Sequence, residues 1–111
     1  MAEIAWGDFE KVELRAGTVV RCEPFPEARK PAFKLWIDLG PLGVKQSSAQ
    51  ITAHYAPEQL VGKQVLCVTN FPKKQVGPFI SEVLTTGLVL PDDTIVLVHP
   101  ERAVPNGSRL A

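Results

Sequence analysis

The sequence predicts an all-β fold, a small barrel of short strands, on two observations. Stretches in which apolar and polar residues alternate dominate the chain, and such alternation is typical of strands that cover one face of a core. The 111 residues include ten prolines and eight glycines, which indicate many turns and favour short elements over long helices. At this length we expect one domain over residues 1–111, whose core starts near residue 8.

Two alternating stretches begin the predicted barrel. Residues 13–22 form the first strand, whose apolar face consists of Leu14, Ala16, Thr18, Val20 and Cys22. Prolines at positions 24 and 26 end this strand, because proline has no N–H to donate to a neighbouring strand. Residues 33–39 form the second strand, with Phe33, Leu35, Ile37 and Leu39 on one face and Lys34, Trp36 and Asp38 on the other.

The rest of the chain supplies one short helix and further strands. A turn at 40–43 leads to a polar third strand over 44–51. Residues 55–61 form one or two helical turns, because Pro57 suits the start of a helix and Gly62 its end. The apolar run at 64–70 predicts a strand covered on both faces. A loop at 71–79 precedes strands at 82–90 and 94–98, which flank a turn at 91–93, and residues 104–108 form a final turn.

The order of these elements narrows the architecture. Five or six short strands, with one short helix between the third and the fourth, is the order expected of an OB-fold. We therefore predict a five-stranded OB-fold barrel with short terminal extensions. A β-sandwich stays open as the alternative, because periodicity alone does not distinguish a sandwich from a barrel.

Charge is balanced over the whole chain but not along it. Twelve basic and twelve acidic residues give a formal net charge of zero, which excludes a globally basic nucleic-acid binder. Residues 29–82, however, hold seven basic and three acidic side chains, a net charge of +4. This asymmetry indicates an anionic partner for the middle of the chain, with a chance scatter of surface lysines as the alternative.

Side chains that could perform covalent chemistry are few. His54 and His99 lie outside any metal-binding motif, and no phosphate-binding or nucleophile motif is present. Cys22 and Cys67 are too isolated for a disulfide framework, so we expect buried, inert thiols in a reducing cytoplasm. We therefore expect no enzyme activity, cofactor or metal site. No apolar stretch suits a membrane span, and the first thirty residues, with six acids, do not resemble a signal peptide.

One loop and one strand carry most of the groups suited to binding. Residues 70–81 combine two lysines, an asparagine and a serine with two phenylalanines, and residues 46–50 add serines and glutamines. Lysines neutralise phosphates, and aromatic rings stack on bases. The alternative is a solvated loop whose rings pack in the core, beside a polar edge strand. Trp36 lies on the polar face of its strand, where it is either an exposed binding platform or covered by the helix or a partner subunit.

Three segments carry a resemblance to a known family: residues 8–17 (DFEKVELRAG), residues 46–62 (QSSAQI followed by YxxExLxG) and residues 70–84. The chain resembles the tRNA-binding domain found at the C-terminus of many methionyl-tRNA synthetases and in free-standing tRNA-binding proteins. It resembles more closely the CsaA-like secretion chaperones of that family, which residues 26–31, 45–51, 70–79 and 81–84 nearly match.

The resemblance implies an OB-fold subunit that forms a homodimer through its terminal segments. It also implies tRNA recognition by Asn70, Lys73, Lys74 and Ser81. The tRNA binders usually end this motif with Ser-x-Gly-Met, whereas this chain has Ser-Glu-Val-Leu at 81–84, which brings the negative charge of Glu82 to the site. CsaA-like proteins are credited with holding unfolded or presecretory polypeptides.

We therefore predict a cytoplasmic, homodimeric, non-enzymatic chaperone for unfolded or presecretory polypeptides in protein export, with the export machinery as a further partner and no insertion into membranes. The alternative is a stand-alone tRNA-binding protein that assists tRNA, or another structured RNA, or an aminoacyl-tRNA synthetase. The predicted RNA contacts are Lys30, Lys34, Ser47, Ser48, Gln50, Asn70, Lys73, Lys74 and Ser81. The predicted peptide contacts are Phe33, Trp36, Phe71 and Phe79. The predicted dimer contacts are Trp6, Phe9, Val104 and Leu110.

Overall fold

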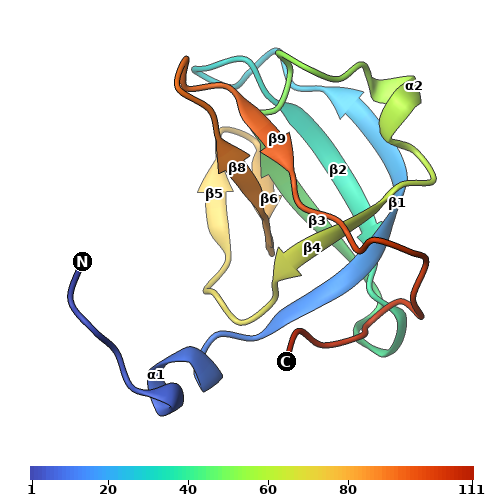
Figure 1. Ribbon diagram of the computed structural model, residues 1–111. Helices are drawn as coiled ribbons and strands as arrows, with labels where there is room; N and C mark the ends of the chain where they lie inside the picture. Colours follow the sequence, from blue (N-terminus) through green and yellow to red (C-terminus); the bar gives the residue numbers. More distant parts are fainter.

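Five antiparallel strands form the wall of a nearly closed barrel in the computed structural model, which describes residues 1–111 (Figure 1). The strands lie in the order β3-β2-β1-β4-β7. Their bounds are β1 (Leu14–Pro24), β2 (Phe33–Asp38), β3 (Val44–Ala49), β4 (Gln64–Val68) and β7 (Leu84–Thr85). The short helix α2 (Pro57–Leu60) lies between β3 and β4, as predicted. The fold is OB-like, which confirms the predicted class.

The segment that leads into β7, residues 81–83, bonds to β3 and closes the barrel. The main-chain N–H of Glu82 donates to the carbonyl oxygen of Gln46 at 2.8 Å. Two side chains complete the contact, because the Gln46 N–H donates to Glu82 Oε1 and the Ser48 N–H donates to Ser81 Oγ, each at 3.0 Å. We call these four residues the closing seam. Here side-chain oxygens accept hydrogen bonds that main-chain carbonyls accept elsewhere in the sheet.

The barrel interior is filled by the predicted inner face of β2 and by side chains of β4, the strand that was predicted to be covered on both faces. Leu35, Ile37 and Leu39 are fully buried, and so are Val65 and Cys67. These side chains belong to one hydrophobic core cluster. The prediction for the inner face of residues 33–39 is confirmed, because strict alternation holds along β2.

The predicted apolar face of the first strand is wrong over most of its length. The register of β1 against β2 shifts between Val19 and Arg21, which is a β-bulge. Val19 is therefore fully buried, whereas Val20 is exposed. Gly17 also faces inward, because an added Cβ would lie 2.6 Å from Ile37 Cγ2. Of the predicted face, Ala16 is buried outside the core cluster, and Cys22 packs against the core cluster because it lies beyond the bulge.

The predicted loop at 71–79 contains regular structure. β5 (Lys74–Val76) and β6 (Phe79–Ser81) pair as a hairpin, in which Val76 lies opposite Phe79. The turn between them has two residues, and Gly77 adopts a φ of +55° that favours glycine. The predicted strand at 82–90 is divided into β7 and β8 (Gly87–Val89), and β8 pairs with β9 (Ile95–Leu97).

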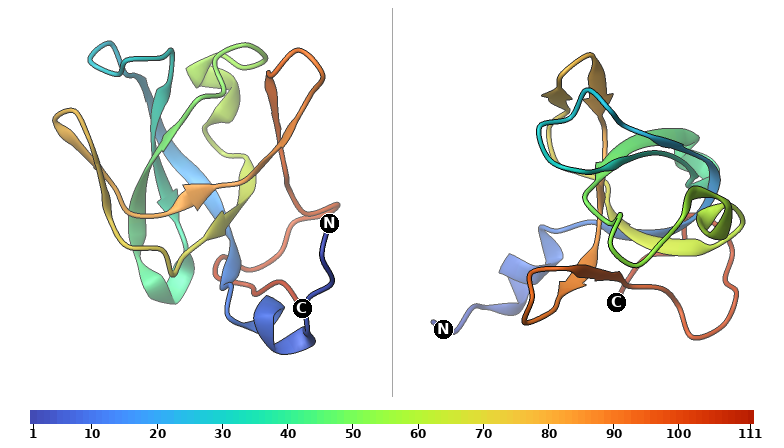
Figure 2. Two further views of the ribbon diagram at one scale, coloured as in Figure 1. Left: turned by 90° about the vertical axis from the view of Figure 1, so that its left-hand side faces the viewer. Right: turned by 90° about the horizontal axis from the view of Figure 1, so that it is seen from above.

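The C-terminus and helix α1 lie near one end of the barrel, and the first residues of the chain extend away from the barrel (Figure 1). The predicted turn at 104–108 is present, and it brings the C-terminal segment back along β1, where the Gly107 N–H donates to the Ala16 carbonyl at 2.7 Å. Helix α1 (Trp6–Glu10) lies outside the barrel, as the end-on view in Figure 2 shows. The 3-10 helix η1 (Gly40–Leu42) forms the turn between β2 and β3. None of the helices has the length and apolar character that a membrane crossing requires.

Candidate functional site

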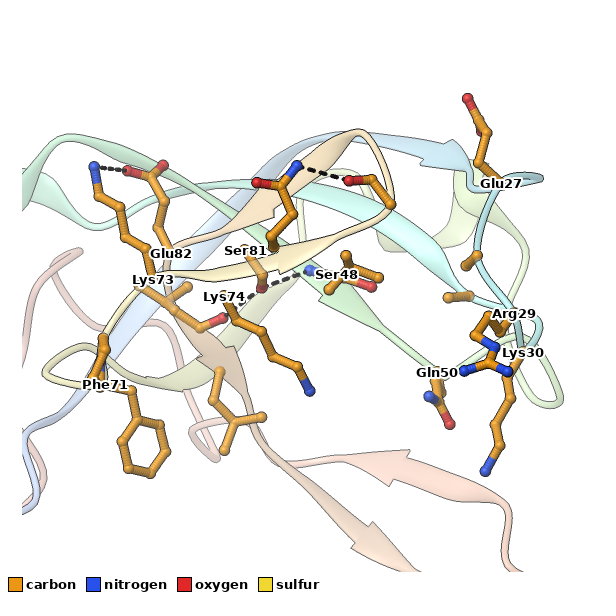
Figure 3. Close-up of a pocket in the computed structure, with 18 residues that line it drawn as sticks. Glu27, Arg29, Lys30, Ser48, Gln50, Phe71, Lys73, Lys74, Ser81 and Glu82 are labelled. Atoms are coloured by element: carbon orange, nitrogen blue, oxygen red, sulfur yellow. Dashed lines mark hydrogen bonds and ion pairs between the residues drawn. The ribbon is translucent and has the colours of Figure 1, made fainter.

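A groove of about 980 Å³ lies beside the closing seam. It is bounded by the β1–β2 loop at residues 27–32, by the β5–β6 hairpin with the loop that precedes it, and by the segment leading into β7. Figure 3 shows that side chains from these separate parts of the sequence face the same space. The groove therefore exists only because the barrel closes at this edge.

One end of the groove is cationic. Arg29 and Lys30 extend from the β1–β2 loop, and Lys74 extends from β5 on the other side (Figure 3). All three side chains are exposed, and none of them takes part in an ion pair with the protein. We call these three residues the cationic end. It presents unpaired positive charge to a ligand.

A fourth cation of the groove is neutralised within the protein. Lys73 Nζ lies 3.8 Å from Glu82 Oε2, and the dashed line in Figure 3 marks this ion pair. The Lys73 side chain is 70% exposed, whereas that of Glu82 is 21% exposed. The other carboxylate oxygen of Glu82 accepts the Gln46 N–H in the closing seam. The Glu82 side chain is therefore fixed by the closing seam, and the exposed Lys73 side chain pairs with it.

The opposite end of the groove is apolar. The ring of Phe71 is 54% exposed, and Leu84 on β7 is 47% exposed. Both side chains line the groove, together with Pro72. We call Phe71 and Leu84 the apolar end. Exposed large apolar side chains inside a concave surface are typical of sites that bind an apolar group.

Six of the nine predicted RNA contacts line this groove: Lys30, Ser48, Gln50, Lys73, Lys74 and Ser81. The hydroxyl of Ser81 already forms two hydrogen bonds within the protein. It accepts the Ser48 N–H and donates to the Val83 carbonyl at 3.3 Å. The role of Ser81 in this structure is to close the barrel.

The other three predicted RNA contacts, Ser47, Asn70 and Lys34, do not line this groove. Ser47 is fully buried, and its hydroxyl accepts a hydrogen bond from Thr85 at 2.8 Å. The Asn70 amide binds the main chain between α1 and β1. Its Oδ1 accepts the Glu13 N–H at 3.0 Å, and its Nδ2 donates to the Lys11 carbonyl at 2.7 Å.

Lys34 is engaged on the outer face of β2. Its ammonium group lies 3.8 Å from Glu23 Oε1 and 5.6 Å from the centre of the Phe25 ring. The side chain is 22% exposed and does not line the groove. Lys34 therefore packs the outer face of the sheet.

Of the four aromatic peptide contacts that were predicted, Phe71 alone lines the groove. Phe33 and Phe79 are buried, so the alternative that loop rings pack in the core holds for Phe79. Trp36 is half-buried, because Arg21 lies 4.5 Å over its ring and Phe79 packs edge-on against it. The Trp36 indole N–H donates to Gln46 Oε1 at 3.2 Å.

Arg29 and Leu84 are among the groove residues that the sequence prediction did not include. The pairing of Arg29 with Lys30 in a proline-flanked loop could have identified the first of them. Nothing local distinguishes Leu84 from a core leucine, because its exposure depends on the path of β7.

The two cysteines are unreactive thiols rather than members of the site. Burial raises the pKa of Cys67 to about 12 and that of Cys22 to about 11. Both residues are free. Since the thiolate is the reactive form, neither side chain supplies a nucleophile near neutral pH.

Three of the predicted dimer contacts gather on a second, shallow surface. Trp6, Phe9 and Leu110 line it with Val12 and Arg109. Trp6 is 67% exposed, and its ring centre lies 5.3 Å from that of Phe9. Val104 does not line this surface, and its main chain instead exchanges hydrogen bonds with the Gln64 amide.

Comparison with known proteins adds a family to this geometry. Residues 14–109 match the family model described as "Putative tRNA binding domain". The chaperone CsaA of Bacillus anthracis has a crystal structure that is 49% identical, with a TM-score of 0.94 over 99% of this chain and 100% of that one. The CsaA chaperone protein of Picrophilus torridus is 41% identical, with a TM-score of 0.91 over 98% of this chain and 100% of that one.

Curated relatives are longer. The methionine–tRNA ligase of Porphyromonas gingivalis is 37% identical over 108 residues, which are 97% of this chain and 16% of the ligase. The chain thus spans about one-sixth of the length of these relatives. Because the family model covers residues 14–109 and the fold agrees throughout, the chain belongs to the tRNA-binding domain family and is a CsaA-like member of it.

Proposed function

We propose that the protein is a chaperone that holds unfolded or presecretory polypeptides in the groove and serves protein export from the cytoplasm. It acts by binding, without covalent chemistry and without a cofactor. The observation that carries this proposal is the exposed apolar end of the groove. The CsaA chaperones with known structures are similar to this chain over nearly all of its length.

The groove offers what an extended polypeptide segment needs. An unfolded chain exposes large apolar side chains, and Phe71 and Leu84 provide a surface that buries them. Such a segment also carries unpaired main-chain N–H and C=O groups. The Ser48 hydroxyl and the exposed Gln50 amide line the same groove and are suited to pair with them.

Binding of tRNA is the second candidate function, in a stand-alone protein that assists tRNA or an aminoacyl-tRNA synthetase. The observation that favours it is the presence of Lys30, Lys73 and Lys74 in one groove of a tRNA-binding domain. Against it stands the ion pair of Lys73 with Glu82, which removes one cation from the set available to phosphates.

A titration at two salt concentrations separates the candidates. We expect a labelled, permanently unfolded polypeptide to bind with an affinity that changes no more than about threefold between about 50 and 200 mM salt, because apolar contacts are not screened. For tRNA we expect a steep slope, which Lys74→Ala flattens by roughly 0.7–0.9 units. Lys63→Ala removes the same charge outside the groove and should leave both ligands unaffected. Steep tRNA binding without any polypeptide binding would establish the second candidate instead.

We also propose that the protein is a homodimer formed through the surface around α1. Trp6, Leu110 and the nearby Ile4 are exposed apolar side chains of the two terminal segments. Burying them against a second copy removes this surface from water.

Trp6→Ala tests the dimer directly. We expect it to raise the dimer dissociation constant by roughly 30-fold, because an aromatic anchor dominates the energy of an interface. Sedimentation equilibrium measures this constant. Val44→Ala, which truncates an exposed apolar side chain elsewhere, is the control and should leave it unchanged. A monomer at micromolar concentration in the unmodified protein would contradict the proposal.

A further inference from the structure

The positive charge of the groove is concentrated at one end. Arg29, Lys30 and Lys74 have no ion-pair partner, whereas Lys73 is neutralised by Glu82. The remaining acid of the groove, Glu27, points away from Lys74 and Arg29 (Figure 3). The groove therefore has unpaired cations at the end that holds Arg29 and Lys30 and, between the ends, at Lys74, whereas the neutralised Lys73 lies toward the end that holds Phe71 (Figure 3).

The Glu82 side chain cannot turn away from Lys73 without breaking a hydrogen bond of the closing seam. Its Oε1 accepts the Gln46 N–H at 3.0 Å, and its own N–H donates to the Gln46 carbonyl at 2.8 Å. Losing the first bond would leave a main-chain N–H of β3 without a partner at the closing seam. The negative charge beside Lys73 is thus a permanent part of the groove and does not yield to an arriving ligand.

This charge distribution fits one kind of ligand better than another. A nucleic-acid strand carries a phosphate at every nucleotide, so it is suited by cations spaced along the whole groove. A polypeptide segment with one acidic side chain carries its charge at one point and can place an apolar side chain at a distance from it. The cationic end, and an apolar end toward which the charge of Lys73 is neutralised by Glu82, match the second pattern.

We propose that the groove selects polypeptide segments with an acidic side chain a few residues from a large apolar one, and that Glu82 is the residue that sets this preference over nucleic acid. The proposal rests on the proposed chaperone function and specifies its substrate class. The acidic side chain binds at the cationic end, and the apolar side chain binds against Phe71 and Leu84.

Matched peptides test the substrate class. Three short labelled peptides contain one phenylalanine and differ only at one position a few residues away, which is Asp, Asn or Lys. We expect the Asp peptide to bind about two- to fivefold more tightly than the Asn peptide at low salt, and the Lys peptide to bind most weakly. Lys74→Gln should reduce the difference between Asp and Asn, whereas the control Lys63→Gln should preserve it.

The outcomes separate this inference from the function on which it rests. Equal affinities for the Asp and Asn peptides would overturn the selectivity and leave polypeptide binding in place. Failure of every peptide to bind, with the cationic and apolar residues intact, would overturn the chaperone function and the selectivity together.

A pair of variants tests the role of Glu82. Glu82→Gln keeps an oxygen that can accept the Gln46 N–H but removes the charge that holds Lys73. We expect this variant to bind a labelled single-stranded oligouridylate about two- to fivefold more tightly, with a salt slope steeper by roughly 0.7. Lys73→Gln should cancel the gain in the double variant while changing little on its own. If Lys73→Gln lowers the affinity for the oligouridylate equally in the unmodified protein and in the Glu82→Gln variant, the proposed role of Glu82 is overturned. The same holds if Glu82→Gln leaves this affinity unchanged.

Discussion

Replacing Phe71 by alanine is expected to weaken the binding of an unfolded polypeptide by about tenfold or more. Phe71 is the aromatic residue of the groove, and its exposed ring has no other surface to cover. When an apolar side chain of the ligand packs against the ring, apolar surface of both partners is removed from water. Truncation of Phe71 therefore removes a large share of the apolar contact area. Fluorescence anisotropy with a labelled, permanently unfolded polypeptide measures the loss.

Two further variants make this result specific. Phe71→Leu keeps apolar volume and should retain a large part of the affinity. Leu42→Ala removes an exposed apolar side chain from η1, outside the groove, and should leave binding unchanged. Because Phe71 is exposed, its replacement should also leave the thermal midpoint of unfolding nearly unchanged. An affinity that survives Phe71→Ala would place the polypeptide site outside this groove.

Replacing Gly40 by alanine is expected to lower the free energy of unfolding by about 3 kcal/mol or more. Gly40 adopts a φ of +63°, which an L side chain adopts only with strain. An added Cβ would also overlap the main-chain carbonyl oxygen of Asn106. Asn106 cannot simply move away, because its Oδ1 accepts hydrogen bonds from Thr18 at 2.8 Å and from Gln64 at 3.1 Å.

Gly62→Ala provides the matched control for this steric effect. Gly62 has a φ of +93°, and an added Cβ there would meet nothing within 4 Å. We expect this variant to cost roughly 1–2 kcal/mol, from backbone strain alone. Urea denaturation of both variants measures the difference, which reports the contact between η1 and the C-terminal segment. Equal losses would show that the C-terminal segment contributes little to the stability of the barrel.

Several parts of this protein follow from the sequence by itself, because the signals that specify them are local. Alternation in residues 33–39 predicts the buried face of β2, and the positions of Pro57 and Gly62 predict α2. The prolines, the glycines and the order of the elements predict the OB-like barrel. The lysines of residues 70–81 also identify one wall of the groove correctly, because they belong to a contiguous, exposed segment.

Other parts are decided only by tertiary structure. Because of the bulge in β1, Val19 and not Val20 faces the interior. The periodicity of the sequence does not reveal a bulge, because the extra residue is defined by the pairing of β1 with β2. In the sequence, Ser81 is predicted as an RNA contact and Glu82 as a negative charge at the same site. They serve the closing seam because the partners of their oxygens, Gln46 and Ser48, lie more than thirty positions away.

The site itself shows the same division. Composition shows that the middle of the chain is basic, but it does not show which cation keeps its charge available to a ligand. The β5–β6 hairpin, in which Lys74 lies opposite Ser81, brings Lys73 next to Glu82, and the fold of the barrel leaves Arg29 facing Lys74 across the groove. Electrostatic and apolar contacts depend on distance in space, and only the long-range pairing of strands fixes which distant residues become neighbours.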